Sequence, residues 1–137
     1  MKWLLDTNVI SETARRHPDE RVLTWLKEEH ASCYTSSIVI SQLAHWVRTK
    51  RGVERKKLQE WLTRLLSNFG ERVLNFTTTT AHVWADLHVK QEKAGQIMPI
   101  IDSYIAATAI QHGLVIASED QDFLNRGLKV FNPFAEL

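Results

Sequence analysis

Three aspartates beside apolar segments are the residues of this chain best placed to do chemistry. Asp6 follows the apolar run Trp3–Leu5, and Asp120 comes soon after the run Leu114–Ala117. Asp102 stands at the start of a predicted helix. Short apolar runs of this kind are typical of buried strands, and in parallel sheets the ligand site lies beyond the carboxyl ends of the strands. The three carboxylates can therefore meet at one edge of a sheet.

Carboxylates that meet in this way repel one another unless a cation neutralises them. Hard oxygen ligands select Mg²⁺ or Mn²⁺ over zinc. Ions held by such ligands lower the pKa of a bound water and stabilise the leaving oxygen in phosphodiester hydrolysis. Asp6 also has a purely structural interpretation, because aspartate is a good N-cap for a following helix. Spacing along the chain leaves both interpretations open.

Other kinds of catalytic site find little support. The chain has neither of the glycine-rich phosphate-binding motifs GxxxxGK[ST] and GxGxxG, and no GxSxG nucleophile motif. Its six histidines lack metal-ligand spacing, and its five tryptophans lie on apolar stripes, so we expect both sets to be structural. The single cysteine, Cys33, excludes an intramolecular disulfide.

Charge is nearly balanced, with a net value of +1 over 137 residues, so only local charge can indicate a nucleic-acid partner. The segment Arg48–Lys57 holds six basic residues and one acid. It is either a solvated loop between two helices or an edge that contacts RNA phosphates. The candidate RNA-binding residues are Arg48, Lys50, Arg51 and Arg55.

No segment approaches the roughly 20 apolar residues needed to cross a membrane, and Asp6 interrupts the short apolar start, so no signal peptide is expected. We therefore expect one domain in the cytoplasm. Strands are predicted near residues 3–5, 31–36, 73–76, 114–117 and 129–131, and helices near 9–16, 20–29, 38–50, 57–68, 81–94 and 102–112. This alternation predicts an α/β fold with a parallel sheet and helices on both faces.

Four segments in this order closely resemble PIN-domain ribonucleases, above all the VapC toxins of bacterial toxin–antitoxin operons. They are LLDTNVISE at 4–12, PIIDSYIAATAIQHGL at 99–114, SEDQDF at 118–123 and NPF at 132–134. The resemblance implies a single PIN domain over residues 1–137, with a three-layer fold whose central parallel sheet of four or five short strands is flanked by helices. It also implies an Mg²⁺- or Mn²⁺-dependent endoribonuclease that acts on RNA, forms a homodimer and is inhibited by a VapB-type antitoxin.

The resemblance also assigns residues. It makes Asp6, Asp102 and Asp120 the catalytic acids and metal ligands. Supporting roles around these acids fall to Thr7, Asn8, Ser118 and Asp122: the first two orient Asp6, Ser118 is a hydroxyl beside Asp120, and Asp122 assists.

The chain departs from the family at Gln42, where the family has a catalytic glutamate in a pattern like AEL and this chain has Ser41-Gln42-Leu43. An amide oxygen can face a cation or its water but carries no charge, so weaker metal binding is expected. Gln42 is compatible with natural variation that retains activity, with low or lost activity, or with an engineered inactivating change. The functions left open are an endoribonuclease, an inactive PIN module that binds RNA or antitoxin, and a DNA-directed nuclease on the same fold.

Overall fold

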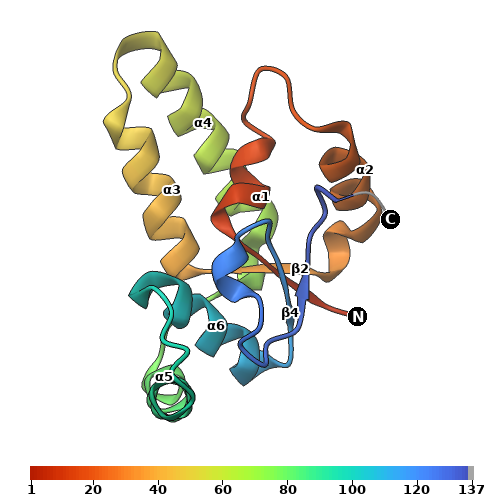
Figure 1. The fold of residues 1–137 in the computed structure, drawn as a ribbon. Helices are drawn as coiled ribbons and strands as arrows, with labels where there is room; N and C mark the ends of the chain where they lie inside the picture. The colour runs from red at the N-terminus through yellow and green to blue at the C-terminus, as the bar shows by residue number, and fades with distance from the viewer. Residues whose placement is uncertain (136–137) are drawn as a thin grey trace.

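A five-stranded parallel sheet forms the centre of the molecule, with strand order β3-β2-β1-β4-β5 (Figure 1). The computed structural model describes residues 1–135, so the last two residues of the predicted 1–137 domain lie outside the described residues. The strands are β1 (Trp3–Leu5), β2 (Cys33–Ser36), β3 (Val73–Leu74), β4 (Val115–Ala117) and β5 (Val130–Phe131). The prediction of an α/β fold built on a parallel sheet is confirmed.

The middle strand, β1, is the most deeply buried. Leu4 and Leu5 are at most 2% exposed, because β1 pairs with β2 and β4 in the middle of the sheet and helices cover the faces to which its side chains point. Leu5 is in register with Ala117 at the end of β4. The residues that follow these two strands therefore emerge side by side at the same edge of the sheet.

Six α-helices pack around this sheet in the described part of the chain: α1 (Thr7–Glu12), α2 (Glu20–Glu29), α3 (Ser37–Thr49), α4 (Gly52–Phe69), α5 (Thr78–Ala94) and α6 (Ile100–His112). Short 3₁₀ turns follow as η1 (His30–Ser32), η2 (Gly70–Arg72) and η3 (Gln121–Phe123). Two helix ends lie where the sequence has strong capping residues. Thr77 forms a capping box at the start of α5, and Gly113 ends α6 in the left-handed conformation that glycine adopts without strain.

The basic segment Arg48–Lys57 is not a loop, which corrects that prediction. It consists of the end of α3, a two-residue link at Lys50 and Arg51, and the first turns of α4. Helix α4 begins at Gly52, five residues before the predicted start. Lysine, arginine and glutamate are good helix formers, and Lys50 lies 3.9 Å from Glu54, so charge along this stretch supports a helix. Its predicted exposure to solvent is correct.

Within residues 1–135, no helix combines the length and the apolar character that a membrane crossing requires.

Candidate active site

Asp6 occupies the end of β1 and is also the N-cap of α1, so both interpretations of this residue hold together. It is 4% exposed. Its Oδ1 accepts a hydrogen bond from the Thr7 backbone N–H at 2.8 Å. Its Oδ2 accepts one from the Ser118 hydroxyl at 2.7 Å and one from the Asn8 side-chain amide at 3.3 Å. These contacts fix the orientation of the carboxylate at the edge of the sheet.

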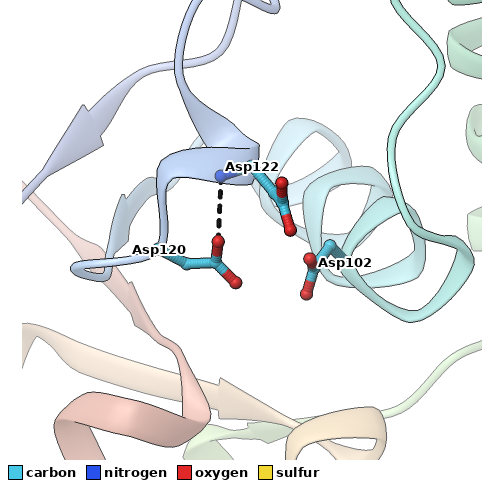
Figure 2. Close-up of side chains that lie close together, drawn as sticks. All are labelled: Asp102, Asp120 and Asp122. Carbon is cyan, nitrogen blue, oxygen red and sulfur yellow. Dashed lines mark hydrogen bonds between the residues drawn. The ribbon is translucent and has the colours of Figure 1, made fainter.

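Asp102, Asp120 and Asp122 converge on one space beside Asp6. Asp102 lies in the first turn of α6, whereas Asp120 and Asp122 come from the segment after β4. One carboxylate oxygen from each of the three lies within 4.8 Å of the other two. Figure 2 shows the side chains from α6 and from η3 pointing toward one another. Asp120 Oδ1 also accepts the Asp122 backbone N–H at 2.9 Å, which holds these two acids in a tight turn.

Electrostatics show that all four acids interact. The pKa of Asp102 is raised to about 7, first because burial penalises its charged form, and then because Asp120, Asp6 and Asp122 repel it. The pKa of Asp6 is also raised, chiefly by burial, although its hydrogen bonds to Ser118 and Thr7 oppose the shift. In the described part of the chain, none of the four forms an ion pair with a basic side chain.

These observations fit a divalent cation. Carboxylates held in a half-buried cluster without a cationic side chain carry an unfavourable charge that a hard metal ion would neutralise. Asp102, Asp120 and Asp122 are the residues close enough to share an ion, and Asp6 borders them.

The supporting residues form one hydrogen-bond network. Besides Asp6, the Ser118 hydroxyl oxygen is contacted by the Asn8 amide at 3.1 Å and by the Asp120 backbone N–H at 3.0 Å. The Asn8 side-chain oxygen accepts the Glu119 backbone N–H at 3.3 Å. Ser118 therefore links the start of α1 to the segment after β4, although the two are more than a hundred residues apart in sequence.

Gln42 lies on α3 and contacts the start of α1. Its Oε1 accepts a hydrogen bond from the Thr7 hydroxyl. The structure therefore places Gln42 beside the residue that follows Asp6. Thr7 serves Asp6 through its backbone and Gln42 through its side chain.

All three predicted metal ligands lie at this edge of the sheet, and Asp122, predicted to assist, lies with Asp102 and Asp120 in the closest group. Asp6 borders this group and interacts electrostatically with Asp102 and Asp120. The turn that holds Asp120 and Asp122 has a local sequence signal, because an aspartate side chain readily accepts the backbone N–H two residues on, as Asp120 does from Asp122. The candidate RNA-binding residues Arg48, Lys50, Arg51 and Arg55 lie at the far end of α3 and the start of α4, away from the acids.

The chain is similar to known proteins both in sequence and in structure. A family model described as PIN domain matches residues 3–128. Toxin FitB of Neisseria gonorrhoeae is 37% identical, over 96% of this chain and 97% of that protein. The VapC ribonuclease Y4jK of Sinorhizobium fredii is 33% identical over 96% of each chain. The crystal structure of FitAcB from Neisseria gonorrhoeae matches with a TM-score of 0.90 and 37% identity, over 96% of this chain and 98% of that one. The predicted three-layer α/β fold is confirmed.

Proposed function

Because the chain belongs to the PIN domain family, we propose that it is a metal-dependent endoribonuclease and the toxin of a type II toxin–antitoxin pair. The observation that carries the proposal is the group of carboxylates from Asp6, Asp102, Asp120 and Asp122, which meet at the sheet edge with no cationic side chain of the described residues to neutralise them. Relatives that cover nearly the whole chain are named as a toxin and as a VapC ribonuclease. An inactive binding module is not favoured by these comparisons.

VapC-type PIN nucleases depend on a metal ion, and Mg²⁺ or Mn²⁺ is the ion we propose here. Asp102, Asp120 and Asp122 would hold it, with Asp6 at its border. When bound, the ion would supply an activated water and stabilise charge on the leaving oxygen. Gln42 would act as a neutral outer residue that holds Thr7, and thereby Asp6, in place.

The chain's own residues prepare this site for the reaction. Ser118, Asn8 and the Thr7 backbone donate to both oxygens of Asp6, so this carboxylate does not reorganise when substrate arrives. The raised pKa of Asp102 means that, without a cation, it holds a proton during part of the time near neutral pH. A cation would displace this proton, so metal affinity should rise with pH.

The proposal is tested with a labelled single-stranded RNA, purified protein and either Mg²⁺, Mn²⁺ or EDTA. Cleavage should need the metal. Asp6→Asn and Asp120→Asn should each lower the cleavage rate by more than ~100-fold. A loss of up to that size is typical when a residue that only orients a metal ligand is removed. Glu119→Gln is the matched control, because Glu119 is an exposed acid beside Asp120 and outside the group of acids. Metal-independent cleavage, or full activity of Asp6→Asn, would contradict the proposal.

A parallel DNA substrate decides whether the enzyme is directed to RNA, because a site that reads the 2′-OH discriminates between RNA and DNA.

An antitoxin partner is part of the same proposal. A groove of about 520 Å³ runs between α2 and α4, with the apolar side chains of Leu26, Leu65 and Phe69 in its lining. Such a groove suits the apolar face of a partner helix. Growth arrest caused by the chain should be relieved by the small protein encoded beside it. Leu65→Asp should abolish this relief, whereas Leu66→Asp, on the exposed neighbour, should not.

Three further parts of the proposal concern assembly, location and domain extent. We propose a homodimer, which sedimentation equilibrium tests. We propose a cytoplasmic location, because RNA is found there and Cys33 is a free thiol. We propose that residues 1–137 form a single PIN domain, which is consistent with the chain covering 97% of FitB.

A further inference from the structure

A second charged feature lies outside the group of acids, where the segment after α1 faces the α3–α4 hairpin. A hollow of about 450 Å³ opens between the segment that follows α1 and the hairpin formed by α3 and α4. Arg15, Arg16 and His17 line it from the first side, and Trp46 and Lys57 line it from the second. We call these five residues and the space between them the basic hollow.

The basic hollow carries excess positive charge. Arg15 is partly neutralised by Glu12 at 3.3 Å, and the only acid in the lining, Glu54, lies 3.9 Å from Lys50. Arg16 and Lys57 are exposed and form no ion pair within residues 1–135. Like charges that gather around one concave surface raise its potential and attract anions.

The floor of the basic hollow is fixed in place. The Trp46 ring is half-buried, packs edge-to-face on Trp61 at 6.0 Å between centroids, and has the Lys50 ammonium 5.8 Å from its centroid. Trp61 donates a hydrogen bond to the Thr13 hydroxyl at 3.1 Å, which ties α4 to the end of α1. The two sides of the hollow therefore keep their spacing without a ligand.

The basic hollow and the acids are connected by two helices. Helix α1 begins at Asp6, and α3 carries Gln42, which contacts Thr7. The hollow is lined by residues just after α1 and by Trp46 near the end of α3. Along α3, Gln42 and Trp46 are four residues apart, which is about 6 Å of helix rise. Trp46, in the lining of the hollow, therefore lies about one helical turn from Gln42, the residue that contacts Thr7 beside Asp6.

We infer that the basic hollow binds the phosphate backbone of the RNA substrate a few nucleotides from the bond that is cut. This inference rests on the proposed function and adds to it the segment after α1, which no sequence pattern indicated. Arginine and lysine contacts to phosphates set affinity and register and carry no base specificity. The hollow would therefore select single-stranded or flexible RNA long enough to span it, and not a particular sequence.

The first test measures RNA binding in EDTA, so that no cleavage occurs. Wild-type protein is compared with Arg16→Ala/Lys57→Ala by the fluorescence anisotropy of a labelled single-stranded RNA over a range of salt concentrations. Each phosphate contact on a single strand contributes about 0.7 to the slope of log K against log salt, so the double variant should lower the slope by about 1.4. The control, Lys90→Ala/Lys93→Ala, removes the same charge from exposed positions on α5 and should keep the wild-type slope.

The second test compares cleavage of a long RNA with cleavage of an oligonucleotide too short to reach the hollow. The ratio of kcat/KM for the long over the short substrate should fall several-fold in Arg16→Ala/Lys57→Ala and stay at the wild-type value in the α5 control. A wild-type slope and ratio in the hollow variant would overturn the inference. The inference would also be overturned if the hollow variant bound RNA like wild type but its growth arrest were no longer relieved by the antitoxin. The hollow would then be a protein interface. If wild-type protein cleaves neither substrate, the proposed function fails, and the anisotropy still decides whether the hollow binds RNA.

Discussion

Replacing Asp102 by asparagine should stabilise the metal-free protein and weaken its stabilisation by metal. Asp102 lies among Asp120, Asp6 and Asp122 and has a pKa of about 7 against an ordinary value of 3.8. Its ionised form is therefore disfavoured in the folded state. An asparagine side chain at this position would keep the size and remove the charge, so the repulsion would disappear.

The magnitude follows from the pKa. A tenfold change in acidity corresponds to about 1.4 kcal/mol, so a rise from 3.8 to about 7 would cost roughly 4 kcal/mol if realised in full. Asp102 is only half-buried, and solvent screens part of the repulsion, so about 1–2 kcal/mol is the expected gain in the free energy of unfolding. In a chain of this size, that gain raises Tm by about 3–7 °C.

The pH dependence gives the sign of the effect. A carboxyl whose pKa is raised on folding contributes stability below its unfolded pKa, and this contribution is lost as pH rises through the folded value. The advantage of Asp102→Asn over wild type should therefore be absent near pH 4, grow up to about pH 7 and remain constant above it. Asp86→Asn, which changes an exposed acid on α5, should show no such trend.

The assay is thermal unfolding in EDTA and in Mn²⁺ across this pH range. Wild-type protein should be stabilised by Mn²⁺ at pH 8, and Asp102→Asn should be stabilised much less, since it lacks one of the three closest carboxylates. A variant that is less stable than wild type in EDTA at pH 8 would refute the reasoning, because it would show that the carboxylate is favourably held without a cation.

Two further predictions concern residues around the acids. Gln42→Glu should tighten Mn²⁺ binding several-fold in calorimetric titration, because it would place a further anionic oxygen beside Thr7, next to Asp6. Unchanged affinity would show that this position does not sense the ion. Ser118→Ala removes the hydroxyl that contacts Asp6, Asn8 and the Asp120 backbone, and should lower the cleavage rate by about 10–100-fold. Ser118→Thr keeps a hydroxyl and should retain part of the activity. Equal activity of both variants would argue against a positioning role.

Local sequence patterns determined most of the secondary structure and the family of this chain. The apolar run ending at Asp6 predicts a buried strand, and Thr77 and Gly113 mark helix ends through capping chemistry that acts within a few residues. The α4 start was missed because periodic apolar residues identify a helix only where one face is buried, and the first turns of α4 are exposed on all sides.

The composition of the site was decided by tertiary structure. Strand β4 lies beside β1 although β2 and β3 come between them in sequence, and this order brings Ser118 onto Asp6 and carries Asp120 and Asp122 toward Asp102. Which acids lie closest, and the contact of Gln42 with Thr7, depend on how loops and helices pack around that edge. Such contacts join residues far apart in the chain, and their geometry has no signature in any local pattern of residue types.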